Sequence, residues 1–350
     1  MIPNQNQFYK IVNKKNDLVA DYGYPETGKP VTLWPWHGED NQRWMFVPLN
    51  DNYYAIVNKK NGLVADYGYP ETGKPVTLWP WHGGDNQQWF LHDLEGGYQK
   101  ISNKKNGLVA DYGYPETGKP MTLWPWHGGD NQRWLPEAVE SFTLPSVQTY
   151  PVPAVPQYTN INEVLPNQTQ IVTTHYTLAT CIAVDDPHYN DQQKIKTNPY
   201  YLYVKKQYWK KVESHVLAPK ESYKYTMTSG MTQEDQNTVS KTVSHTIGVD
   251  AGFQFGKEGR FNVAASLSYQ YTEQLETTVS HTTIQMTETT QEHSIINDEN
   301  YNVAWSKYIL VSEYSVQRSD GTLVSKPWTV TDHNTTQSSY YPLETTLLDK

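Results

Sequence analysis

The sequence predicts an all-β fold in two parts, and three observations support this prediction. A stretch of the N-terminal half occurs three times, with Asp21 returning as Asp66 and Asp111, so that the repeat period is 45 residues. Tyrosine occurs 27 times and tryptophan 12 times, and aromatic richness with few helical periods favours strands. In the second half, long segments mix β-branched and aromatic residues with polar ones, which is typical of strands.

Each of the three copies has the same internal order. A turn rich in Tyr, Gly and Pro precedes a Trp-rich strand, and the copy closes on Asn-Gln-x-Trp at residues 41–44, 86–89 and 131–134. Three copies without insertion or deletion indicate a repeat architecture.

These residues resemble the ricin-B type β-trefoil lectins over about residues 1–135. The resemblance rests on the Gln-x-Trp ending, the Leu-Trp-Pro run before it and the Asp about twenty residues upstream. It implies three repeats around a pseudo-threefold axis, and we assign residues 1–140 to this lectin domain. In that family the Gln-x-Trp pair is mainly structural, which implies core and bracing roles for Gln42, Gln87, Gln132, Trp44, Trp89 and Trp134.

The same resemblance implies glycan sites. A sugar needs polar partners for vicinal hydroxyls and an aromatic face for its C–H surface. The family pattern implies one carbohydrate-binding set in each repeat: Asp21, Trp34 and Asn41, then Asp66, Trp79 and Asn86, then Asp111, Trp124 and Asn131. In addition to the family pattern, His37, His82 and His127 could each add a hydrogen bond. The spacing from Asp to Trp is shorter than in the plant lectins, so Tyr24 or Trp36, with their copies, are alternative stacking rings.

Recent duplication is the other explanation for identical copies. Against it, the connecting segments 45–52 and 90–97 have diverged while the turn has not. The three histidines could instead meet on the axis as a metal site, but they lack the local Cys/His spacing of a zinc motif. We therefore expect neither a metal nor a cofactor.

Composition limits the partners. A net charge of −9 and a pI near 5.7 argue against nucleic acid, and lysine pairs such as Lys14-Lys15 are usually solvated surface. The single Cys181 excludes an intrachain disulfide, and we expect it to be buried. The N-terminus lacks the basic and apolar regions of a secretory signal, and no apolar run is long enough for a membrane helix. These features predict a soluble chain, kept in a crystal or spore inclusion or released by lysis, that then acts outside its cell.

Six prolines interrupt the chain after the repeats. Pro136, Pro145, Pro151, Pro153, Pro156 and Pro166 suit neither a helix nor an inner strand. We assign residues 141–167 to a Pro-rich linker or strap, with the domain boundary near 140–155. Strands are then expected at 170–180, 199–212 and 302–316.

One segment of the second half alternates at every second position. Its apolar residues are Ile247, Val249, Ala251, Phe253, Phe255, Phe261, Val263, Ala265, Leu267, Tyr269 and Tyr271. A hairpin centred on Glu258 pairs Phe255 with Phe261, and each strand approaches the 9 to 11 residues that cross a bilayer. The polar opposite face suits a water-filled lumen. Covering the core of a soluble sandwich is the alternative role.

Polar Thr/Ser-rich segments flank this hairpin at 238–246 and 277–290. They have little to bury in a monomer, but they could pair between chains in a closed ring. His245 and His281 lie in them, and their protonation could bias assembly near neutral pH.

Strands of this kind around an amphipathic hairpin resemble the aerolysin-type β-pore-forming toxins, and we assign residues 168–350 to such a domain. With the trefoil, the whole chain resembles the insecticidal crystal toxins of bacilli, including the Bin-like family. The resemblance implies a glycan-targeted pore-forming toxin. It would bind a cell-surface glycan or a glycoprotein or glycolipid receptor, form a homo-oligomer and insert residues 247–271 into the target membrane, with a second toxin component in some members.

Two other classes of function compete with this reading. A non-lytic multivalent lectin would agglutinate cells without releasing dye from liposomes. An enzyme carrying a carbohydrate-binding module is disfavoured, since Gly-x-Ser-x-Gly, Walker and His-Glu-x-x-His motifs are missing, although carboxylate pairs could still act as acid and base. We expect no catalytic residues.

Overall fold

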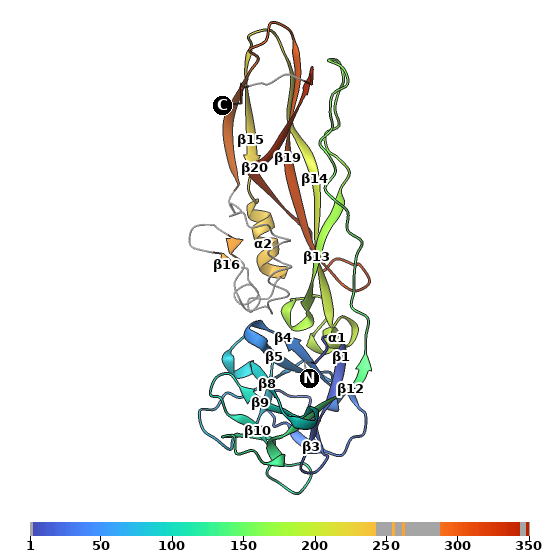
Figure 1. Ribbon diagram of the computed structural model, residues 1–350, viewed down its shortest axis with the longest axis vertical. Coiled ribbons are helices and arrows are strands. Elements are labelled where there is room, and N and C mark those ends of the chain that lie inside the picture. Colours follow the sequence, from blue (N-terminus) through green and yellow to red (C-terminus); the bar gives the residue numbers. More distant parts are fainter. Residues whose placement is uncertain (1–2, 243–253, 256–260, 263–287, 344–347, 350) are drawn as a thin grey trace.

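The computed structural model describes residues 3–242, 254–255, 261–262, 288–343 and 348–349. The molecule is elongated, with the repeat domain at one end and long antiparallel strands rising from it (Figure 1). Two helices, α1 (Asp191–Thr197) and α2 (Gln233–Thr242), are short. The predicted all-β class, with an N-terminal trefoil and an elongated antiparallel second half, is confirmed.

The trefoil consists of twelve short strands, four from each repeat. They are β1 (Gln7–Asn13), β2 (Val19–Asp21), β3 (Thr32–Trp34), β4 (Trp44–Pro48), β5 (Tyr53–Asn58), β6 (Val64–Asp66), β7 (Thr77–Trp79), β8 (Trp89–Asp93), β9 (Gln99–Asn103), β10 (Val109–Asp111), β11 (Thr122–Trp124) and β12 (Trp134–Ser141). The last strand returns to pair with the first, because Trp134 lies opposite Asn13.

Hydrogen bonds close the threefold ring. The amide of Val31 donates to the carbonyl of Val76, that of Val76 to Met121, and that of Met121 back to Val31, each at 2.8 Å. Each repeat therefore supplies a donor to one neighbour and an acceptor to the other, which fixes three repeats as the closed number.

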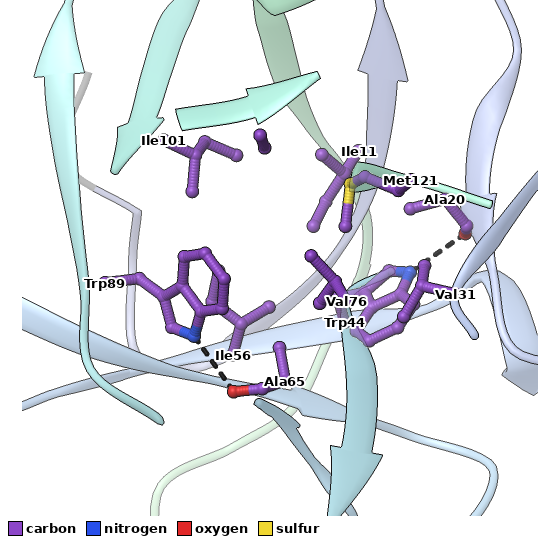
Figure 2. A pocket seen from close by; sticks show the side chains of 11 residues that line it. Ile11, Ala20, Val31, Trp44, Ile56, Ala65, Val76, Trp89, Ile101 and Met121 are labelled. Atoms are coloured by element: carbon purple, nitrogen blue, oxygen red, sulfur yellow. Dashed lines mark hydrogen bonds between the residues drawn. The ribbon is translucent and has the colours of Figure 1, made fainter. Parts of the chain in front are cut away.

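The trefoil core repeats the same side chains around the axis. Trp44, Trp89 and Trp134 are buried, and the indole nitrogen of Trp44 donates to the carbonyl of Ala20. Figure 2 shows the centre, where an apolar cavity of about 20 Å³ remains and Met121 replaces the valines of the other repeats.

The Gln-x-Trp glutamines brace the loop before them. The side-chain oxygen of Gln42 accepts from the amide of His37 at 2.8 Å, and its nitrogen donates to the carbonyl of Pro35 at 2.9 Å. Gln87 and Gln132 make the same pair of bonds. The structural role implied for the Gln-x-Trp pairs is confirmed.

The second half contains two main sheets. One has four strands in the order β13 (Val172–Thr180), β14 (Tyr200–Leu217), β19 (Val303–Gln317) and β20 (Trp328–Tyr341). The other joins β15 (Ser222–Ser229), β18 (Thr289–Ile296) and β21 (Leu348–Asp349). The three strands predicted for this half are present, and two of them extend further than predicted.

The Pro-rich segment is a strap along the four-stranded sheet. Its buried residues Val155, Tyr158 and Leu165 pack against Trp209 of β14 and Tyr308 of β19. Carbonyl groups of the strap accept hydrogen bonds from sheet side chains, including that of Pro153 from Trp209 at 2.9 Å.

Cys181 is buried, as the sequence predicted, and it lies beside α1. Burial raises the pKa of its thiol to about 12.

The two halves share one apolar cluster. Met45 and Val57 of the trefoil pack in it with Ala183, Ile195 and Tyr201 of the second half. This continuous core joins the trefoil end of the molecule to the base of the long sheet (Figure 1).

Two sequence expectations were wrong. Residues 238–242, expected as strand, form the end of helix α2, which begins after Thr232, whose hydroxyl accepts from the amide of Asp235 at 3.1 Å. Pro136, expected to suit neither a helix nor an inner strand, lies within β12 opposite Ile11. The N-cap signal at Thr232 outweighs the strand preference of Thr and Val.

The amphipathic hairpin lies mostly outside the described residues. Its described part is β16 (Gln254–Phe255) paired with β17 (Phe261–Asn262), with Phe255 opposite Phe261, the register expected for a turn centred on Glu258. The remaining hairpin positions, His245 and His281 fall outside the described residues. Within the described residues, no helix is long and apolar enough to cross a membrane.

Candidate glycan sites

A buried aspartate ends the second strand of each repeat. Asp21, Asp66 and Asp111 close the Val-Ala-Asp strands β2, β6 and β10, whose residues are all buried. The side-chain nitrogen Nδ2 of Asn41 donates to Asp21 Oδ2 at 2.7 Å, and the other two repeats have the same contact at 2.7 and 2.8 Å. Each predicted Asp–Asn pair is thus brought together by the fold.

The predicted histidine joins the same carboxylate oxygen. His37 Nε2 lies 3.3 Å from Asp21 Oδ2, and the equivalent distances are 3.3 and 3.4 Å. Among the described residues, no hydrogen bond reaches Asp21 Oδ1, so this oxygen can still accept one. Each histidine binds within its own repeat, so the three do not meet on the axis.

Aromatic side chains form the walls of the site. In the third repeat they surround an open hollow of about 500 Å³ lined by Asp111, Gly113, Tyr114, Thr122, Trp124, Pro125, Trp126, His127 and Asn131. The predicted tryptophan and both alternative stacking rings therefore face the same space. All three rings keep more than a third of their surface exposed.

The neighbouring repeat supports the predicted stacking tryptophan. A Cβ built on Gly118 of the third repeat would lie 2.8 Å from Trp34 Cζ2, so only glycine fits there. Gly28 and Gly73 meet Trp79 and Trp124 in the same way. One edge of each indole is thus fixed by a turn glycine at φ near +70°, a conformation that glycine adopts without strain.

Lysines from the next repeat complete the surroundings. Lys60 Nζ donates to the carbonyl of Gly23 at 3.1 Å, and Lys15 Nζ to that of Gly113 at 3.4 Å. The sequence analysis interpreted these lysine pairs as solvated surface and did not predict the contacts. Repetition of Asn-Lys-Lys-Asn at 13–16, 58–61 and 103–106 was the available signal.

The repeats differ at two positions beside the site. Glu39 occupies the place that Gly84 and Gly129 hold in the other copies. Trp36 and Trp126 have a lysine Nζ within 5.7 and 5.6 Å of their rings, whereas Trp81 packs against the cluster shared by the two halves. The three sites share one polar centre but have different edges.

Comparison with known proteins gives the context of this geometry. A model of the ricin-type beta-trefoil lectin domain matches residues 7–134. A second model, described as Insecticidal Crystal Toxin, P42, matches residues 170–342. The resemblance to the Bin-like insecticidal crystal toxins is confirmed.

Individual relatives agree with these matches. The chain is 32% identical over 202 residues to the binary larvicide subunit BinA of Lysinibacillus sphaericus, covering 57% of this chain and 53% of BinA. It is 28% identical over 197 residues to subunit BinB of the same organism, covering 56% and 43%. The chain thus spans about half the length of the curated relatives it matches.

A solved structure extends the likeness to almost the full chain. The crystal structure of Cry35Ab1 superposes with a TM-score of 0.77 at 22% identity, covering 97% of this chain and 91% of that chain. This likeness establishes the shared fold.

Proposed function

We propose that the chain is a glycan-targeted β-pore-forming toxin that acts on insects. The trefoil binds cell-surface carbohydrate, the chains oligomerise, and the hairpin at 247–271 inserts as a transmembrane β-barrel. The observation that carries the proposal is a set of three Asp–Asn–His sites with aromatic walls, joined to a half that matches an insecticidal crystal toxin model.

Weak single sites are sufficient for such a protein. A millimolar Kd corresponds to about −4 kcal/mol. Up to three sites on one trefoil, multiplied by oligomerisation on a membrane, raise the overall affinity through effective concentration.

The lectin half of the proposal is tested by removing the acceptor in every site. We expect the triple substitution Asp21→Asn, Asp66→Asn and Asp111→Asn to weaken binding to immobilised glycans at least tenfold, because the amide replaces one acceptor oxygen by a donor. The exposed turn residues provide the control, Glu26→Gln, Glu71→Gln and Glu116→Gln. Equal binding by both triple variants would contradict the assignment.

The pore half is tested by placing a charge on the apolar positions of the hairpin. We expect Phe253→Asp or Leu267→Asp to leave glycan binding intact and to abolish dye release from glycolipid-containing liposomes, since a charge facing lipid is costly. Ser266→Asp, on the polar positions, is the matched control and should release dye. Wild-type release by both apolar-position variants would refute the hairpin assignment.

A second toxin component is part of the proposal, because both named relatives are subunits of a binary larvicide. Dye release is therefore measured before and after limited proteolysis and with an added candidate partner chain. Glycan binding without release in every condition would leave a non-lytic lectin as the function.

A further inference from the structure

The two lysines of each Asn-Lys-Lys motif have different environments. The first is paired with carboxylates, since Lys14 Nζ lies 2.9 Å from Asp130 and Lys104 Nζ lies 3.0 Å from Asp85. Lys59 Nζ likewise lies 3.2 Å from Asp40 and 2.6 Å from Glu140. These lysines hold adjacent repeats together.

The second lysine contacts only a neutral group. Lys15 and Lys60 donate to the backbone carbonyls of Gly113 and Gly23, and neither has a carboxylate within ion-pair distance among the described residues. Lys105 is the threefold equivalent of Lys15 and Lys60. Its neighbour Lys104 pairs with Asp85, so this segment also lies against the preceding repeat. Each of these ammonium groups therefore has donors and charge available for a ligand.

The contacted glycine belongs to the glycan site itself. Gly113 lines the hollow of the third repeat together with Asp111 and His127. In the first repeat, a Cβ built on Gly23 would lie 3.6 Å from Asp21 Oδ1, the carboxylate oxygen that remains open. The lysine of the following repeat thus stands at the rim of the site, on the side where a sugar hydroxyl is expected.

We propose that these sites select acidic glycans, with Lys15, Lys60 and Lys105 each binding a carboxylate or sulfate substituent of a sugar held by the preceding site around the axis. The inference rests on the proposed glycan binding. An ammonium bound only to a carbonyl can form an ion pair with an anionic substituent, in which both the donor and the acceptor are charged. A neutral sugar offers the same ammonium only a hydroxyl oxygen and therefore forms no ion pair with it.

The first repeat provides an internal contrast. Its Glu39 replaces a glycine whose Cβ would lie 2.5 Å from the site amide in the second repeat, Asn86 Oδ1. The backbone amide of Glu39 donates to His37 Nδ1 at 3.4 Å. The side chain of Glu39, with its carboxylate, therefore starts next to the site. It repels an anionic sugar, and the first site has the weakest acidic preference.

The test uses the intact chain and calorimetric titration with two matched pairs of sugars. One pair is galactose and galacturonic acid, and the other is N-acetylgalactosamine and its 4-sulfate. At low salt we expect the acidic member of at least one pair to bind about tenfold more tightly than its neutral partner. The preference should shrink at 0.5 M NaCl, where exposed charges are screened.

The variant Lys15→Gln, Lys60→Gln and Lys105→Gln should lose the acidic preference and keep the binding of neutral sugar. The control variant Lys29→Gln, Lys74→Gln and Lys119→Gln removes the same net charge from the exposed turns and should keep the preference. In a chain with Asp66→Asn and Asp111→Asn, which leaves the first site alone, Glu39→Gly should strengthen binding of the acidic sugar.

Equal affinity of the wild-type chain for both members of each pair would overturn the inference. A loss in the control variant as large as in the Lys15 set would do the same, because bulk charge would then explain the effect. Absence of binding to every glycan on a broad array would instead refute the proposed lectin function.

Discussion

A buried ion pair fixes the end of β19 to the loop before α1. Arg318 donates from Nε and Nη2 to the two oxygens of Asp186 at 2.8 and 2.7 Å, and the hydroxyl of Tyr201 adds a third bond at 3.0 Å. Burial alone would raise the pKa of the Asp186 carboxyl, but the hydrogen bonds and the charge of Arg318 outweigh burial and lower it. The carboxylate is therefore ionised in the folded protein.

The lowered pKa predicts a loss of stability in acid. The stabilisation from ionised Asp186 is complete above the pKa of an unfolded aspartate, about 3.9, and it is lost as the pH falls through the lower pKa of the folded state. We expect Asp186→Asn to destabilise the protein by about 3 to 5 kcal/mol at pH 7, because Arg318 then stays buried without its partner. Urea unfolding at pH 7 and pH 3 measures both effects, and a difference between wild type and variant that does not shrink at pH 3 would contradict this account.

At the scale of elements, the strap is held on the sheet by buried side chains and by its backbone carbonyls. Leu165 is 3% exposed, while its neighbour Val164 is 87% exposed. The carbonyl of Leu165 accepts from Lys211 Nζ at 2.8 Å, and the carbonyl of Pro166 accepts from the hydroxyl of Tyr308 at 2.8 Å. The strap therefore covers the sheet with a few buried side chains, Val155, Tyr158 and Leu165, while its other residues face solvent or are partly exposed.

Truncating the strap at these neighbouring positions gives a matched pair. We expect Leu165→Ala to cost about 2 to 5 kcal/mol, because a buried leucine leaves a cavity, and to speed proteolysis within residues 142–171. Val164→Ala should change stability by less than about 0.5 kcal/mol. Thermal unfolding and timed digestion measure both, and equal digestion rates for the two variants would show that the strap does not depend on this contact.

At the scale of the whole molecule, the turn at Gly62 in the second repeat packs against the other half. A Cβ on Gly62 would lie 2.4 Å from the carbonyl oxygen of Asp191, at the start of α1, whereas a Cβ on the equivalent Gly107 meets nothing within 4 Å. Nearby, Lys196 Nζ pairs with Asp40 at 2.9 Å across the same interface. The threefold symmetry of the trefoil is thus used asymmetrically, because the first and second repeats meet the second half at Asp40 and Gly62 while the equivalent turn at Gly107 has open space around it.

This asymmetry predicts different effects of one substitution at equivalent positions. Both glycines have φ near +70°, so alanine introduces similar backbone strain at each. Gly62→Ala should also open the interface, and solution scattering should report a larger radius of gyration. Gly107→Ala should keep the compact arrangement, and identical scattering from both variants would remove the docking role of Gly62.

The sequence by itself determined the features that depend on local, repeated spacing. The period of 45 residues is read from the three copies, and the resemblance of each copy to the ricin-B type lectins implied the trefoil, the Gln-x-Trp braces and the grouping of Asp21 with Asn41. Single Asp and Asn side chains only 20 residues apart are brought together by the hydrogen bonds of their own repeat.

Only the tertiary structure decided what crosses between repeats and between halves. Lys60 reaches Gly23 over 37 residues and Lys15 reaches Gly113 over 98, and these contacts depend on the direction in which the ring closes. The docking of Gly62 against Asp191 depends on where the second half packs on the trefoil. Local propensity carries no information on these contacts, because the partners of each lie in different repeats or in different halves of the chain.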